Sequence, residues 1–188
     1  MTRLALAAAL LPLALAAAPA RAQTSSASTT TQAAAPLMLF NPPGTSYYAS
    51  LDTIGTAVTV RGARAQAFHA LRSVYAELQV PLTLEDSASG WLGTLHLIRT
   101  YTLGTMRLSR ALDCGSEMTG PVADDARIEL ALVTFVRAVG ADSVAVRTAL
   151  VASSRSVTGE QRDRVQCSTK GYLEDWIRGR LLERAARN

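Results

Sequence analysis

The two cysteines of this 188-residue chain, Cys114 and Cys167, flank its clearest strand patterns. Between them, apolar residues recur at every second position over 127–138 and again over 143–153, with a Gly-containing turn between the two stretches. This alternation predicts two half-buried strands, and the short turn predicts that they pair as an antiparallel hairpin. We expect the cysteines to form a disulfide that joins this central hairpin to a C-terminal helix.

The first 22 residues have the pattern of a secretory signal peptide. Arg3 precedes an uncharged run of Leu and Ala over 4–18, and Ala20-Arg21-Ala22 matches an A-x-A cleavage site. The apolar run is shorter than the roughly 18 to 20 residues of a membrane-spanning helix. We therefore expect a bacterial protein that is exported to the periplasm or secreted, cleaved before Gln23, with no membrane span in the mature chain. An even number of cysteines in an oxidising compartment also favours a disulfide.

Composition separates the remaining chain into two parts. Residues 23–36 are uncharged and rich in Ser, Thr, Ala and Gln, which predicts a disordered linker. Residues 37–188 have the length of one domain with a hydrophobic core. Without the signal segment, the chain has 17 basic and 15 acidic residues, and the basic residues form no cluster in the sequence. The sequence therefore predicts no nucleic-acid partner.

Helical and extended patterns follow one another along the expected domain. Spacings of three and four between apolar residues predict a first helix over about 63–80 and a last helix that starts near Ser168 to Gly171 and runs to about Ala185. Further strands are expected over 51–60, from Leu82 and over 91–100, with a helical turn at 109–113 that presents Cys114. The short apolar run Leu37–Phe40 fits either an edge strand or a loop plug, and 154–164 is expected to be a loop.

The resulting order is β-α-β-β-β-β-α, an α+β fold with an antiparallel sheet and two helices on one of its faces. Across about Leu51 to Ala185 this order resembles the helix-grip domains of the BamC type in outer-membrane assembly. The resemblance lies in topology. It implies the fold, but no motif residue matches and the lipid-attachment cysteine is missing, so it assigns no functional residue to this chain.

The titratable residues do not form a recognisable catalytic or metal-binding pattern. His69 and His96 are the only histidines, and they lack the close spacing of a zinc site. Asp124-Asp125 lacks the surrounding pattern of a calcium loop, and neither G-x-S-x-G nor G-x-G-x-x-G occurs. The sequence therefore predicts no enzyme, no catalytic residue, no cofactor and no metal.

Two non-enzymatic functions are consistent with these patterns. The first is a protein-binding module whose partner is another envelope protein, with an interaction patch around Val133 and Phe135 on the less regular face of the hairpin. The alternative is a carrier of a small hydrophobic ligand, held in a cavity between sheet and helix. An exposed patch favours the module and an enclosed cavity favours the carrier. The oligomeric state does not follow from the sequence.

Overall fold

A long antiparallel hairpin forms the centre of the fold. In the computed structural model, which describes residues 37–40, 47–50, 55, 57–155 and 164–187, strand β11 (Arg127–Gly140) pairs with β12 (Ser143–Arg155) along its length. The register runs from Arg127 opposite Arg155 to Gly140 opposite Ser143. The hairpin predicted from the alternating pattern is therefore confirmed, and both strands extend slightly beyond their predicted ends.

Five further strands complete a seven-stranded sheet around this hairpin. The order is β4-β5-β11-β12-β13-β8, and β3 pairs with β12 at the end nearest the β11–β12 turn. Every pairing is antiparallel. These strands are β3 (Ala57–Arg61), β4 (Leu84–Asp86), β5 (Trp91–Thr100), β8 (Leu112–Asp113) and β13 (Val165–Thr169).

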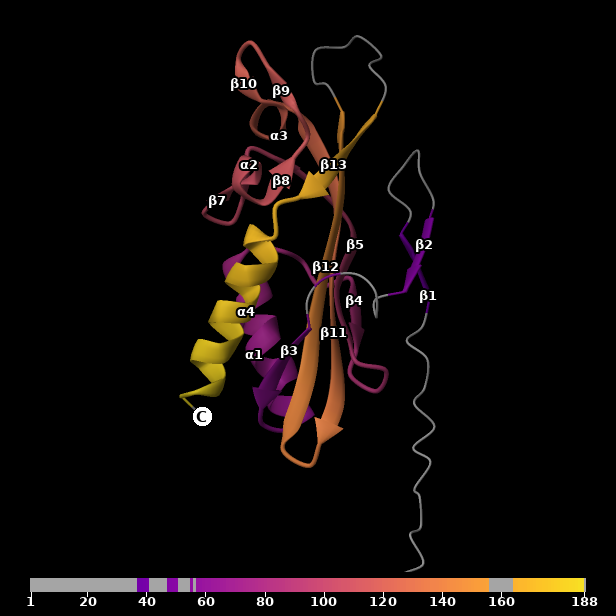
Figure 1. Cartoon of the computed structure of the whole chain (residues 1–188), viewed down its shortest axis with the longest axis vertical. Helices are drawn as coiled ribbons and strands as arrows, with labels where there is room; N and C mark the ends of the chain where they lie inside the picture. Colours follow the sequence, from indigo (N-terminus) through magenta and orange to yellow (C-terminus); the bar gives the residue numbers. More distant parts are fainter. Residues whose placement is uncertain (1–36, 41–46, 51–54, 56, 156–163, 188) are drawn as a thin grey trace, which may run out of the picture. The chain divides into compact units, whose positions relative to one another are not determined.

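Two helices, α1 (Arg64–Glu77) and α4 (Tyr172–Ala185), lie against the same face of this sheet (Figure 1). The sheet face below them carries every second residue of β11 and β12, as alternation requires. The two helices also contact each other, and Glu77 of α1 forms ion pairs with Arg180 and Arg184 of α4. The predicted α+β class with both helices on one sheet face is confirmed.

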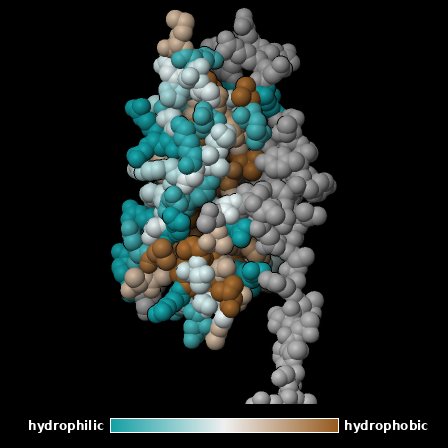
Figure 2. All heavy atoms as spheres, viewed as in Figure 1, coloured by the Kyte–Doolittle hydropathy of each residue, from teal (hydrophilic) through white to brown (hydrophobic). Residues whose placement is uncertain are grey.

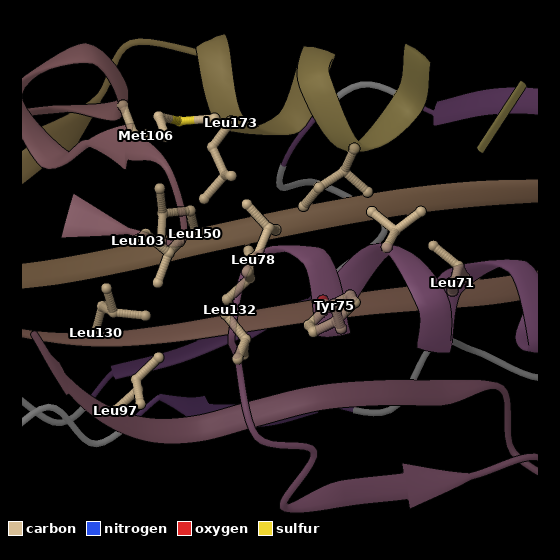
Figure 3. Close-up of a cluster of buried hydrophobic side chains, with 14 of the residues drawn as sticks. Leu71, Tyr75, Leu78, Leu97, Leu103, Met106, Leu130, Leu132, Leu150 and Leu173 are labelled. Carbon is tan, nitrogen blue, oxygen red and sulfur yellow. The ribbon is translucent and has the colours of Figure 1, made fainter. Parts of the chain in front are cut away.

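The space between α1 and the sheet is filled by side chains. Leu71 and Tyr75 of α1 and Leu78, directly after the helix, are almost completely buried. Figure 3 shows Tyr75 and Leu78 close to Leu132 of β11. Leu173 at the start of α4 and Leu150 of β12 belong to the same core. These side chains fill the layer around Leu71 and Tyr75, as expected for a protein interior. A pocket of about 200 Å³ lies between β3, the first half of α1 and the end of α4.

The segment between β5 and β11 folds into short elements at one end of the sheet. A helical turn, α2 (Leu108–Ala111), leads directly into β8 and so to Cys114, as predicted. The other short elements are β6 (Thr102–Leu103), β7 (Met106–Arg107), β9 (Ser116–Glu117), β10 (Gly120–Pro121) and α3 (Val122–Asp125).

Near the N-terminal end, Leu37–Phe40 forms a strand, β1, that pairs with β2 (Tyr47–Ser50) in a separate two-stranded sheet. The choice between strand and loop plug is thereby decided for the strand. The predicted signal segment, linker and Gln23 cleavage site lie outside the described residues, as does most of the predicted loop after Ser154. The residues up to Thr169 form strand β13 and not the predicted start of the last helix. Helix α4 therefore begins only at Tyr172.

Candidate functional site: a cleft beside helix α4

The start of α4 is fixed by polar contacts from the end of β13. The Thr169 hydroxyl accepts a hydrogen bond from the Gly171 amide at 3.1 Å and donates one to Glu174 Oε1 at 2.6 Å. Gly171 adopts a left-handed conformation with φ 76°, which glycine adopts without the steric cost that a Cβ brings. Lys170 reaches back to the Ser109 carbonyl at 2.8 Å. These contacts fix the direction in which the chain leaves the sheet and enters the helix.

A cleft of about 340 Å³ lies where α4 crosses the edge of the sheet. The edge of β12 is paired with β3 over 143–147 and with β13 over 152–154, and the cleft lies beside the interval between the two pairings. Val58, Val146, Ile177 and Leu181 give it an apolar floor. Polar or small residues complete its lining: Gly55, Thr148, Thr169, Gly171, Glu174, Asp175 and Arg178.

The rim of this α4 cleft carries charges of both signs. Asp175 and Arg178 form an ion pair at 2.7 Å, so their charges largely offset each other. Glu174 Oε1 accepts a hydrogen bond from Thr169, whereas its Oε2 is buried and has no hydrogen-bond partner among the residues that the structure describes. A buried carboxylate oxygen without a donor carries a desolvation cost. The cleft therefore combines an apolar floor with a lining carboxylate, Glu174, one oxygen of which is inaccessible to solvent.

A buried chain of hydroxyl groups links the cleft to α1. The Tyr75 hydroxyl lies 2.9 Å from Thr134 Oγ1, and Thr134 Oγ1 lies 3.0 Å from Thr148 Oγ1. Burial raises the pKa of Tyr75 well above its ordinary value near 10, and the bond to Thr134 only partly opposes this shift. Tyr75 therefore stays neutral, and the three hydroxyls hold the cleft residue Thr148 against the core.

The predicted disulfide between Cys114 and Cys167 is present, with an S–S distance of 2.02 Å. Its position differs from the prediction in one respect. Cys167 belongs to β13, which pairs with β8 through Ser168 opposite Asp113 and Thr169 opposite Leu112, so the two cysteines continue that register. The disulfide therefore links the segment that contains α2 and β8 to β13, and it acts on α4 only through Lys170 and Gly171.

Val133 and Phe135 lie on the sheet face opposite the helices, as their place in the alternation predicted. They do not form an exposed patch: Val133 has 0% of its surface exposed, and Phe135 is partly buried. The Phe135 ring lies 4.7 Å from the ring of Trp91, which is also buried. A role of Val133 and Phe135 in binding a partner stays a prediction.

The two histidines lie on different elements. His69 is an exposed residue of α1 beside a shallow depression with Ser73, Arg184 and Arg187, and His96 is exposed on β5. In the part of the chain that the structure describes, no group of three or more His, Cys, Asp or Glu residues could hold a metal ion. No helix there is both long enough and apolar enough to cross a membrane.

Sequence reasoning missed the α4 cleft because its walls come from β3, β12, β13 and α4, which are far apart in the chain. One local signal was available: Thr169 followed five residues later by Glu174 at the start of a helix marks a polar helix start that fixes the geometry of this region. The sequence matches no protein-family model and no curated protein. The candidate site therefore rests on its geometry alone.

Proposed function

We propose that this protein is an exported, non-enzymatic binding module that recognises a segment of another envelope protein through the α4 cleft. The observation that carries this proposal is the open cleft itself, with an apolar floor flanked by a charged rim. An apolar side chain that enters a desolvated pocket and is surrounded by polar contacts is the usual arrangement of a binding hot spot. Figure 2 shows hydrophilic and neutral side chains over α4 and hydrophobic ones beside it, over the sheet.

The chemistry of the rim indicates what the bound segment should contain. The apolar floor of Val58, Val146 and Ile177 suits one aliphatic or aromatic side chain. The Glu174 carboxylate lines the cleft, and a Lys or Arg of the partner suits such a group through a charge-assisted hydrogen bond. We therefore infer a partner segment in which a large apolar residue is adjacent to a basic residue.

Two observations favour this function over the hydrophobic-ligand carrier. Core side chains such as Leu71 and Leu132 fill the centre of the layer between α1 and the sheet (Figure 3), and the pocket between β3, α1 and α4 is smaller, about 200 Å³. The α4 cleft is open to solvent, whereas small-molecule sites bury most of the ligand surface. A cleft of about 340 Å³ at the surface suits one anchoring side chain of a larger partner.

Export is the second part of the proposal, and the disulfide supports it. Disulfides form and persist in oxidising compartments such as the periplasm, and Cys114 and Cys167 are bonded. N-terminal sequencing of protein from the native host tests this part, with Gln23 as the expected first residue. Intact Met1 in the cytoplasmic fraction would contradict export without affecting the α4 cleft.

Binding through the α4 cleft is tested in two steps. A photo-reactive phenylalanine analogue at Arg178, on the cleft rim, should crosslink a partner in the native envelope, whereas the same analogue at Glu183, on another side of α4, should not. The purified partner is then titrated with two single variants of β3. Val58→Glu places a charge in the floor, and Thr59→Glu is the matched control because Thr59 is the next, exposed residue of the strand.

We expect Val58→Glu to weaken binding at least about tenfold, which corresponds to ~1.4 kcal/mol, and Thr59→Glu to leave it unchanged. Circular dichroism checks that both variants are folded. Equal affinity of the two variants contradicts binding in the α4 cleft. A lipid that copurifies with the wild type and is lost in Val58→Glu supports the carrier instead.

A further inference from the structure

The sheet face opposite the helices is buried although no described helix lies over it. Trp91, Ala131, Val133, Ala149 and Val151 are each at most 5% exposed, and Leu84 and Phe135 pack against them. Helices α1 and α4 both lie on the other face (Figure 1). We call this group of seven residues the outer apolar face. Its burial requires an occupant.

The shape of the outer apolar face suits another layer of β-structure. Ala131 of β11 and Ala149 of β12 lie in its middle, and small side chains there let a second backbone approach the sheet closely. The Trp91 and Phe135 rings stand at one side of this floor, 4.7 Å apart. Aligned sheets pack face to face about 10 Å apart through apolar side chains of this kind.

Among the described residues, the β1–β2 hairpin shares no backbone pairing with the rest of the sheet. Its strands pair with each other, from Leu37 opposite Ser50 to Phe40 opposite Tyr47, and form a sheet of their own in the described part of the chain. An isolated two-stranded hairpin is at best marginally stable in water and needs an apolar surface to pack on. The sequences LMLF and YYAS supply apolar residues at alternating positions on both faces.

The chain itself keeps this hairpin near the outer apolar face. β2 ends at Ser50, and Gly55 lies directly on β12, where a Cβ at Gly55 would be only 2.2 Å from the Thr148 carbonyl oxygen. Five residue steps span at most about 18 Å. Thr148 is adjacent to Ala149, a residue of the outer apolar face. A tether this short gives the hairpin a high effective concentration at that surface.

We propose that the β1–β2 hairpin docks in cis on the outer apolar face and forms a second β-layer there. The domain then has helices on one side of its sheet and a hairpin on the other. While the hairpin is docked, Val133 and Phe135 are not available to a partner. This inference does not depend on the α4 cleft, because the two surfaces lie on opposite faces of the sheet.

Photo-crosslinking in the full-length chain tests the docking. The reactive analogue is placed at Leu39 in one variant and at Phe40 in another, because these neighbours belong to opposite faces of β1 and one of them must face the sheet. Equal amounts of ¹⁴N- and ¹⁵N-labelled chains are mixed before irradiation. We expect crosslinks within one chain to peptides that contain Val133 or Val151.

Crosslinks between ¹⁴N and ¹⁵N chains would show that a second copy supplies the hairpin, which overturns docking in cis. Crosslinks from neither position, or only to other parts of the domain, overturn docking itself. A folded chain is verified in each case by the presence of the Cys114–Cys167 disulfide in the digest.

Tryptophan quenching gives an independent measurement. In a Trp176→Phe background, Trp91 is the only tryptophan and reports on the outer apolar face. Paired substitutions of Leu37 and Leu39 to Glu, or of Met38 and Phe40 to Glu, charge one face of the hairpin each. We expect one pair to raise acrylamide quenching of Trp91 severalfold and the other pair to have little effect. Unchanged quenching in both pairs contradicts the proposal.

Discussion

The hydroxyl of Tyr75, in the last turn of α1, lies 2.9 Å from the Thr134 hydroxyl in the middle of β11. Tyr75 has no exposed surface, and neither has Thr134. A hydrogen bond between two buried polar groups fixes their relative position more narrowly than apolar packing does. This contact therefore sets how α1 lies on the sheet, and through Thr148 it also holds one wall of the α4 cleft.

The first prediction concerns Tyr75→Phe. The substitution removes the hydroxyl and leaves the ring, so we expect a loss of about 1–2 kcal/mol in the free energy of unfolding. Chemical denaturation at neutral pH measures this loss. An increase in stability would contradict the assignment of Tyr75 as a favourable hydrogen-bonding partner.

The same residue predicts a dependence on alkaline pH. Burial holds the pKa of Tyr75 above that of the unfolded chain, which is near 10. The folded state therefore keeps the proton longer. The associated stability is fully present below pH 10 and is lost as the pH rises further. We expect the melting temperature of the wild type to fall more steeply above pH 10 than that of Tyr75→Phe. Parallel curves would contradict this linkage.

A second prediction compares two buried hydroxyls of the sheet. The Thr134 hydroxyl bonds to Tyr75 and Thr148, whereas Ser153 Oγ is buried and, within the described part of the chain, has no hydrogen-bond partner. Ser153→Ala should leave the free energy of unfolding unchanged or raise it, because it removes an unsatisfied group. Thr134→Val should lower it by about 1–3 kcal/mol, because it leaves buried partners unpaired. Equal losses in the two variants would show that Ser153 has a partner in solution.

A third prediction concerns the disulfide. The cysteines are 53 positions apart, and closing a loop of that length stabilises the folded state by roughly 4 kcal/mol in the chain-entropy model. We expect the double variant Cys114→Ser, Cys167→Ser to lose about this amount. Hydrogen exchange should show the first loss of protection in β8 and β13, followed by the start of α4. The centre of α1 is the internal reference, and equal loosening there would contradict a local effect.

A fourth prediction separates two neighbouring residues of α4. Ile177 is 1% exposed, whereas Trp176 is partly buried with the Arg180 guanidinium over its ring, 5.4 Å from the ring centroid. Ile177→Ala should cost about 2–5 kcal/mol, as for other buried aliphatic residues. Trp176→Ala should cost less, about 1–2 kcal/mol, because its ring keeps contact with water. A larger loss from Trp176→Ala would place the ring deeper in the core.

The sequence predicted best the elements in which apolar residues recur at a regular spacing. Strand β5 has the predicted bounds, Trp91 to Thr100, and the β11–β12 hairpin follows the alternating pattern. Apolar residues of α1 and α4 repeat every three or four positions, so the spacing predicted the buried face of each helix, except that Trp176 of α4 is only partly buried. Sequence reasoning also paired the two cysteines correctly.

Strand β13 was missed for a physical reason. Of its five residues only Cys167 is buried, so its side chains show no alternating apolar pattern. It is a strand because its backbone pairs with β12 on one side and β8 on the other. Backbone hydrogen bonds to distant strands do not require any particular side-chain pattern, so the sequence of β13 did not indicate a strand.

By itself, the sequence determined the α+β class, the central hairpin, the two amphipathic helices and the disulfide, because periodicity and cysteine pairing are properties of short segments or of residue type. Only the tertiary structure decided that Val133 is buried and that Glu174 lies beside an apolar cleft with Val58 and Ile177. Both facts depend on which elements pack together across more than a hundred residues of chain. A side chain's surroundings are set by that packing, and the residue's own chemistry determines only what it can do there.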